Sequence, residues 1–296
     1  GDDDLLDALI FTAALDANMA PVNRDPDLQV AYGGVEVSAP DELRRPVSIN
    51  AVAQSLRLPF ETVRRRFLRL SRAGLCMITP RGVVVPRSAV TSAAYIAMQR
   101  ARYDRARGFY QALKVAGALP PAEAVPETAP ETGPQPGQAP PPASAPLVRA
   151  ANRALSEYVL RACNDLLALT GDVLSSLVLL ELVLANTRAL TTAALADWIR
   201  DPERVGRPVR IAALAAPLRV SGETIRRHLD VLETLGFCRR TAGGLVAIAP
   251  ASALPKLDSL VRANQANVQR LFGRLRQLDI LAAWDTPHAV SGGARA

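Results

Sequence analysis

Apolar residues in the segment 59–70 recur with the period of an α-helix. Val63, Phe67 and Leu70 are spaced i, i+4 and i+7, which places them on one face that is expected to be buried. The opposite face is rich in arginine and is expected to point to solvent. The segment is therefore predicted to be an amphipathic helix with an exposed basic face.

The same pattern occurs a second time, 162 residues further along the chain. Residues 45–85 align with residues 207–247 without a gap, and 18 of the 41 positions are identical. The apolar stripe of the second copy is Ile225, Leu229 and Leu232. Because chance does not produce such identity, the sequence predicts an internal duplication.

Each copy also predicts the elements around its basic helix. A shorter amphipathic helix is expected at 49–56 and at 211–218. The link that leads from it into the basic helix, 57–60 or 219–222, is short enough to force a helix-turn-helix corner. Apolar runs on either side of a turn then predict a two-stranded hairpin at 75–85 and at 237–247. A short apolar β segment precedes each first helix. The predicted fold class is mainly α with small β-wings.

This order of elements resembles the winged helix-turn-helix superfamily of the broad Crp/Fnr, IclR, GntR and MarR type, and no closer family. The run Glu-Thr-Val/Ile-Arg-Arg resembles the start of a Crp-type recognition helix. The resemblance implies binding to double-stranded DNA, with base contacts from Glu61 and Arg65 and from Glu223 and Arg227. The first copy departs from the pattern at 59–60, Pro-Phe, where a small polar residue is usual.

Positive charge is concentrated on the same segments. Residues 44–81 contain nine Arg and one acidic residue, and residues 207–240 contain seven Arg and three acidic residues. A groove of DNA would receive these segments, although a solvated arginine face or a protein-binding winged helix would carry similar charge. The predicted DNA-binding residues are Glu61, Thr62, Arg64, Arg65, Arg66, Arg69, Arg72 and Arg81 in the first copy and Glu223, Thr224, Arg226, Arg227, His228, Arg239 and Arg240 in the second.

Composition supports a globular chain with a polyanionic partner. The 296 residues are 49% hydrophobic and carry a net charge of +7. Cys76 and Cys238 are expected to be small buried residues in a reducing compartment. His228 and His288 lack cysteine or carboxylate neighbours at ligand spacing, so neither a metal nor another cofactor is expected.

No secretory signal fits residues 1–20, and the most apolar run, 173–185, is shorter than the roughly 20 residues that span a bilayer. We therefore expect a cytoplasmic, nucleoid-associated protein of bacterial type with no membrane partner. Gly1 in place of Met leaves open whether further sequence precedes residue 1.

Helices are expected to flank both copies. An apolar helix at 5–18 matches 173–186 and aligns Asn18 with Asn186, while the longer connector of the first copy is expected to be a surface loop near 25–34. Long helices at 92–115 and 256–278 either form a homodimer, as such helices do in MarR-like proteins, or cap their own unit. One more amphipathic helix is expected at 147–169.

The segment 120–146 has ten prolines in 27 residues and no aromatic residue, so it cannot build a core. We therefore predict a first winged domain at 1–118, a Pro-rich linker at 119–146 and a second winged domain at 147–296.

The main functional hypothesis is a transcription regulator whose two winged units act as a pseudo-dimer on double-stranded DNA. A replication-initiator-like protein also fits two winged helices in one chain, and a winged-helix interaction scaffold is the alternative outside DNA binding. An enzyme is not expected, because the sequence has no phosphate-binding glycine loop, nucleophile elbow or paired His and carboxylate. The residues identify no effector and no operator. They do not distinguish an activator from a repressor, or pairing of the two units within one chain from pairing of two chains.

Overall fold

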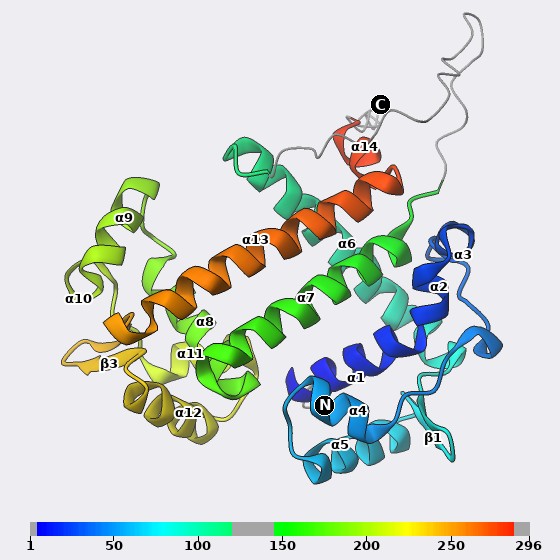
Figure 1. The fold of residues 1–296 in the computed structure, drawn as a ribbon, viewed down its shortest axis with the longest axis horizontal. Coiled ribbons are helices and arrows are strands. Elements are labelled where there is room, and N and C mark those ends of the chain that lie inside the picture. Colours follow the sequence, from blue (N-terminus) through cyan, green and yellow to red (C-terminus); the bar gives the residue numbers. More distant parts are fainter. Residues whose placement is uncertain (1–4, 120–144, 287–296) are drawn as a thin grey trace, which may run out of the picture. The chain divides into compact units, whose positions relative to one another are not determined.

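The structure, a computed structural model, describes residues 5–119 and 145–286 (Figure 1). Most of the predicted linker, 120–144, and His288 lie outside the described residues. The predicted fold class, mainly α with small two-stranded sheets, is confirmed. The helices are α1 (Leu5–Asn18), α2 (Ala20–Arg24), α3 (Pro26–Ala31), α4 (Ile49–Ser55), α5 (Phe60–Arg72), α6 (Ala93–Val115), α7 (Val148–Thr170), α8 (Val173–Thr187), α9 (Thr192–Arg200), α10 (Pro202–Val205), α11 (Ile211–Leu218), α12 (Gly222–Thr234), α13 (Leu254–Gln277) and α14 (Ile280–Asp285). The strands are β1 (Met77–Thr79), β2 (Gly82–Val84), β3 (Cys238–Thr241) and β4 (Gly244–Ala247), and the 3₁₀ turns are η1 (Asp41–Leu43), η2 (Arg87–Val90) and η3 (Ala251–Ala253).

The described residues group into two compact units that differ from the predicted sequential domains. The first contains residues of Gly1–Asn18, Pro46–Val85 and Val159–Asn264. The second contains residues of Met19–Arg45, Pro86–Tyr158 and Gln265–Ala296. Each unit therefore draws on both halves of the chain.

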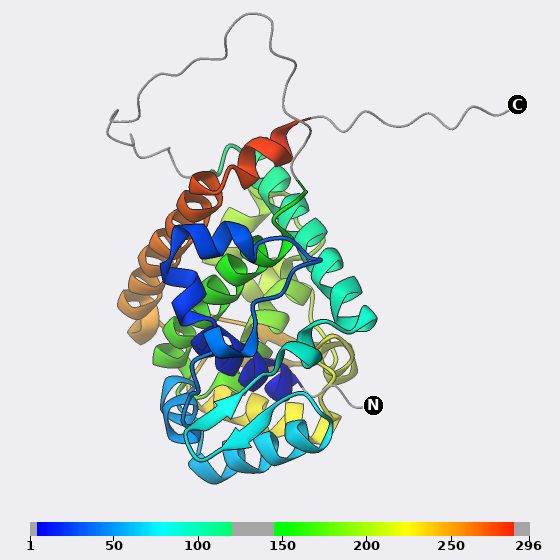
Figure 2. The ribbon, with the colours of Figure 1, turned by 90° about the vertical axis from the view of Figure 1, so that its right-hand side faces the viewer.

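Within the first unit, α1, α4, α5 and the β1–β2 hairpin form one module. Val63, Phe67 and Leu70 of α5 are buried, as their spacing predicted. Strand β1 pairs antiparallel with β2 (Figure 2). Val47 adds a short bridge to Val83. The expected β segment before the first helix is thus present as a bridge on the hairpin.

The second module, formed by α8, α11, α12 and the β3–β4 hairpin, repeats this arrangement. Ile225, Leu229 and Leu232 of α12 are fully buried in its core. Val209 bridges Leu245, at positions equivalent to Val47 and Val83. Helices α9 and α10, between α8 and α11, have no counterpart in the first module.

Tight backbone approaches recur in both modules. Arg57 and Arg219, at the helix-turn-helix corners, adopt left-handed φ values of 49° and 51°. At the turn of each hairpin, Gly82 and Gly244 have φ values of 131° and 136°. A Cβ at Gly82 would lie 2.5 Å from the carbonyl oxygen of Val47, so glycine is required there.

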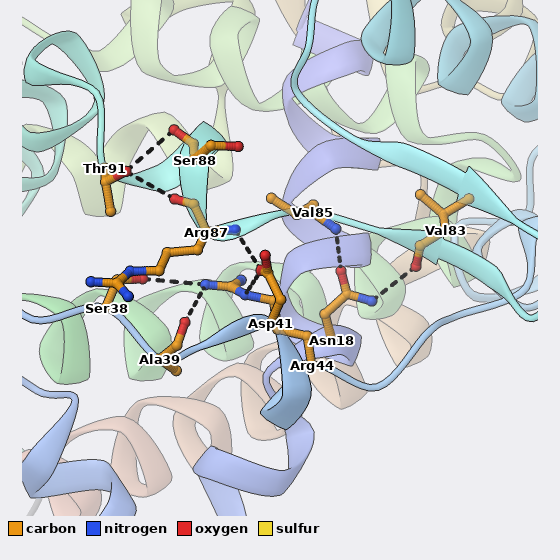
Figure 3. A network of polar contacts seen from close by, with 10 residues as sticks. All are labelled: Asn18, Ser38, Ala39, Asp41, Arg44, Val83, Val85, Arg87, Ser88 and Thr91. Carbon is orange, nitrogen blue, oxygen red and sulfur yellow. Dashed lines mark hydrogen bonds and ion pairs between the residues drawn. The ribbon is translucent and has the colours of Figure 1, made fainter.

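A buried asparagine joins the first helix of the module to its wing. The Asn18 Nδ2 donates to the carbonyl of Val83 at 3.0 Å, and its Oδ1 accepts from the backbone N–H of Val85 at 2.8 Å (Figure 3). These bonds satisfy the side chain in a position with no solvent exposure.

The cysteines behave as buried small residues. Cys76 and Cys238 are free thiols whose Sγ atoms donate to the carbonyls of Phe67 and Leu229 at 3.6 Å. Burial raises the pKa of each thiol to about 11. Both therefore stay protonated and unreactive near neutral pH.

The core of the second unit contains residues from both halves of the sequence. Tyr110 of α6 lies 5.6 Å from Phe272 of α13 and 5.7 Å from Trp284 of α14, measured between ring centroids. Val148 and Ala151, at the start of α7, belong to the same cluster. The apolar face of α6 thus packs against α13 and α14 in the second unit and not on the first module, so this helix departs from the capping alternative; pairing of two chains stays a prediction.

Buried arginines hold the connector before the first module. The Arg44 Nη2 donates to Ser38 and to the Ala39 carbonyl at 3.2 and 3.1 Å (Figure 3). Arg149 donates to the carbonyls of Val35 and Val90. Burial lowers the pKa of both guanidinium groups, and these bonds offset part of the desolvation cost.

The expectation of a surface loop near 25–34 is wrong, because α3 lies there. Asp25 caps this helix by accepting from the N–H groups of Asp27 and Leu28, and Pro26 occupies its first turn. An Asp-Pro start is a helix signal that the length comparison between the copies does not reveal.

No single described helix is long and apolar enough to cross a bilayer; α7 and α8 pass that test only when taken together, across a bend of 95°.

Candidate nucleic-acid interface

Helix α5 presents the first candidate surface. Because its apolar stripe faces the core, Glu61, Arg65, Arg69 and Arg72 lie exposed on the other side. Arg65 is the most open of the ion-paired residues here, with 70% of its side chain exposed. Thr62 and Arg64, at the edges of this face, are half-buried.

Glu61 is held by its own helix. Its carboxylate accepts two hydrogen bonds from Arg64 at 2.8 Å and lies 3.7 Å from the Arg65 guanidinium. The hydrogen bond from Arg64 lowers the pKa of Glu61, so the group is a charged acceptor near neutral pH. Each Glu61 oxygen accepts one of these bonds and keeps a further lone pair, so the carboxylate can also accept from a base.

Arg66 and Arg69 contact α1 rather than pointing freely to solvent. The Arg66 Nη1 lies 3.0 Å from Asp7, only 22% of the Arg66 side chain is exposed, and Arg69 bonds the other oxygen of Asp7. This geometry favours a supporting role for Arg66, and its DNA contact stays a prediction.

Arg72, at the end of α5, and Arg81, at the tip of the hairpin, are exposed. No described residue forms an ion pair with either side chain. Both charges are therefore available to an anionic partner.

Helix α12 presents the second candidate surface. Ser221 caps it, with Oγ accepting from the N–H of Thr224 at 3.1 Å. Glu223 pairs with Arg226, in the manner of Glu61 and Arg64. Arg227 is exposed and makes no ion pair with a described residue.

His228 lies on the side of α12 that contacts the start of α8, with 13% of its side chain exposed. Its Nδ1 is 3.0 Å from the Ser175 Oγ and 3.5 Å from the Asp172 Oδ1. Burial opposes ionisation of Asp172, but the bonds from His228 and Ser175 prevail and lower its pKa to about 2. As with Arg66, these contacts favour a supporting role for His228, and its DNA contact stays a prediction.

The two arginines on strand β3 of the second module, Arg239 and Arg240, both form ion pairs. Arg239 pairs with Glu203 of α10, and Arg240 pairs with Asp230 and Glu233 of α12. The two modules therefore differ in how much of their positive charge is free. Sequence spacing could not show the partners Asp7, Asp172 and Glu203, because each lies on another element.

No group of three or more His, Cys, Asp or Glu side chains that could hold a metal ion occurs in residues 5–119 and 145–286.

Comparison with curated proteins and with solved structures gives no match. Residues 204–251, which contain α11, α12 and the β3–β4 hairpin, match the family model of the DeoR-like helix-turn-helix domain, and this match supports a winged helix-turn-helix DNA-binding domain in that segment.

Proposed function

We propose that the chain is a sequence-specific transcription regulator in which two winged helix-turn-helix units bind double-stranded DNA as a covalent pseudo-dimer. The observation that carries the proposal is the DeoR-like match at 204–251, on a segment whose helix α12 turns Arg227 to solvent. DeoR-like helix-turn-helix domains suggest transcription regulation.

Matching contacts support extending the proposal to the first module. The bridge of Val47 with Val83 corresponds to that of Val209 with Leu245. The left-handed corners also coincide. These correspondences, together with the sequence identity, support a tandem duplication of one DNA-binding unit.

In this proposal, α5 and α12 each enter a major groove. Arg65 and Arg227 are placed to bond guanine in a bidentate manner, since both are exposed opposite the buried stripe. Glu61 and Glu223 would accept from cytosine through the lone pairs that Arg64 and Arg226 leave open.

The test is DNA binding by the full chain, first to fragmented genomic DNA to find its sites and then to one isolated site across a salt series. Arg65→Ala and Arg227→Ala should each weaken the specific site by about 1–3 kcal/mol without unfolding the protein. Arg105→Ala is the matched control, because it removes an exposed arginine from α6. Equal affinity of all three variants and the parent chain would reject the recognition-helix assignment.

A further inference from the structure

Two arginines occupy a backbone conformation that glycine ordinarily takes. Arg57, at the corner between α4 and α5, has a φ of 49°, and Arg219, at the equivalent corner between α11 and α12, has a φ of 51°. A residue with a Cβ is disfavoured in this left-handed region, and asparagine and aspartate tolerate it better than arginine does. Among the described residues, Asp279 is the one other non-glycine residue with a positive φ. Arginine at the corner is thus an exception that both modules share.

Each corner is closed by the hydrogen bonds of a Schellman motif. The N–H of Leu58 donates to the carbonyl of Ala53 at 2.9 Å, and the N–H of Arg57 donates to the carbonyl of Gln54 at 3.2 Å. Equivalent bonds close the second corner around Arg219. The motif requires a left-handed residue just after the end of the helix, and glycine is the usual residue there.

Three helices elsewhere in the described chain end in the same motif, and each has glycine at that position. These residues are Gly74 after α5, Gly117 after α6 and Gly236 after α12, with φ values of 70°, 63° and 78°. Glycine therefore serves where the backbone conformation alone matters. Both helix-turn-helix corners carry arginine in spite of the steric cost, which indicates a role for the arginine side chain.

The fold itself makes no use of the Arg57 side chain. Both corner arginines are exposed to solvent. No described residue forms a side-chain hydrogen bond or an ion pair with the Arg57 guanidinium. A positive charge in this position is available to an anion outside the protein.

The corner lies where the phosphates of DNA would run in the proposed function. In helix-turn-helix proteins the second helix enters the major groove, with its N-terminal residues at the base edges, while the first helix crosses the backbone. The turn between the two helices therefore passes over phosphates at the edge of the groove. Arg57 comes three residues before Phe60, the first residue of α5, and Arg219 comes three residues before Gly222, the first residue of α12.

We propose that Arg57 and Arg219 bind DNA phosphates and position each module on the DNA backbone, and that arginine stands at the corner for this contact and not for folding. The inference rests on the proposed function, in which α5 and α12 enter DNA. A guanidinium can bond two phosphate oxygens through parallel N–H groups, and a phosphate contact carries no sequence information. Both arginines therefore add to affinity for any duplex.

The experiment measures binding of the full chain to a fluorescent random-sequence duplex across a salt series, for the parent and for Arg57→Gly, Arg219→Gly and the double variant. Glycine removes the charge and relieves the left-handed backbone, so each single variant should keep or raise the melting temperature. Each should nevertheless bind about three- to tenfold more weakly at roughly 0.1 M salt, with the slope of log K against log salt reduced by about 0.9. The double variant should lose about twice as much slope.

Three control variants separate the charge from the backbone. Arg57→Ala removes the same charge but keeps a Cβ in the left-handed region, so it should lose the same slope and melt at a lower temperature than Arg57→Gly. Asp279→Gly relieves the same conformation at the start of α14 and should keep the slope of the parent chain. Arg105→Ala removes an exposed arginine from α6 and should also keep that slope.

A clear fall in the melting temperature of Arg57→Gly, or its failure to fold, would show that the side chain serves folding and would overturn the inference. Unchanged slopes in both single variants, with DNA binding intact, would also overturn it and leave the proposed function standing. A loss confined to one variant would reject the assignment at the other corner.

An equal loss of slope in Arg105→Ala would mean a general effect of net charge and would overturn the inference as well. Absence of DNA binding by the parent chain, on random and genomic duplexes alike, would instead reject the proposed function and the inference together.

Discussion

Asn18 and Asn186 make the same pair of hydrogen bonds, each to the second strand of the wing in its own module. Asn18 bonds Val83 and Val85, and Asn186 donates to Leu245 at 3.1 Å and accepts from Ala247 at 2.7 Å. Both side chains have no solvent exposure. A side-chain amide thus takes the place of a neighbouring strand for two backbone groups of the hairpin.

Removing either amide should destabilise the protein. Asn18→Ala or Asn186→Ala leaves the buried N–H of Val85 or Ala247 without a partner, at a cost of about 1–3 kcal/mol, while the Val83 and Leu245 carbonyls keep their bonds from Val47 and Val209. Chemical denaturation measures the loss, and Asn164→Ala, at an exposed position on α7, should change the unfolding free energy by less than about 0.5 kcal/mol. A loss in Asn18→Ala as small as in this control would mean that water replaces the amide.

Two phenylalanines of α5 lie on different faces, one buried and one exposed, and substituting each tests which face packs on the core. Phe67 is fully buried, whereas Phe60 is 49% exposed. Phe67→Ala should therefore cost about 3–5 kcal/mol by opening a cavity, and Phe60→Ala much less. Leu229→Ala tests the second module in the same way, with an expected loss of about 2–5 kcal/mol. A larger thermal shift in Phe60→Ala than in Phe67→Ala would reverse the assignment of the faces.

The local elements could be predicted from the sequence, but their long-range partners could not. The i, i+4, i+7 spacing of Val63, Phe67 and Leu70 determines which face of α5 is buried, because the helical period is fixed. The contact of Arg66 with Asp7 depends on how α1 packs against α5, and no local spacing encodes that packing. The predicted DNA-binding residues therefore include Arg66, which contacts another helix, together with Arg72 and Arg81, which form no ion pair with a described residue.

The core of the second unit contains residues from both halves of the chain, and this affects whether each half can fold alone. The sequence pattern predicts two halves that fold independently, but Tyr110 packs on Phe272 and Trp284, which lie in the other half. We therefore predict that 1–118 and 147–296 each lose part of this helical core when expressed alone. Hydrogen exchange would show α6 unprotected in the first piece, and protection should return when both pieces are mixed. Full protection of α6 in isolated 1–118 would contradict a shared core.

Asp172 should make stability depend on pH in the acid range. Its folded pKa of about 2 is below the usual 3.8, so its contribution is complete above about pH 4 and is lost as pH falls towards 2. The side chain is 37% exposed, so solvent screening reduces the effect. Asp172→Asn should lower stability at pH 7 and flatten its decline between about pH 4 and pH 2, whereas Asp104→Asn, an exposed carboxylate on α6, should not. Parallel stability curves for Asp172→Asn and the parent chain would mean that the carboxylate is not held by the fold.

The two modules should contribute unequally to DNA affinity. Arg72 and Arg81 of the first module make no ion pair with a described residue, whereas Arg239 and Arg240 of the second are paired with Glu203, Asp230 and Glu233. A phosphate must compete with those carboxylates to bind Arg239 and Arg240. It can bind Arg72 and Arg81 without displacing a carboxylate. Each phosphate that the protein neutralises adds roughly 0.9 to the slope of log K against log salt.

In the full chain, the double variant Arg72→Ala with Arg81→Ala should therefore reduce that slope by about two, and Arg239→Ala with Arg240→Ala by less than one. Both variants remove two exposed positive charges, so a general effect of net charge would change the two slopes equally. A salt series on one duplex compares them directly. A greater loss of slope in the Arg239 and Arg240 variant would show that DNA displaces the carboxylates and that the second module carries the electrostatic part of binding.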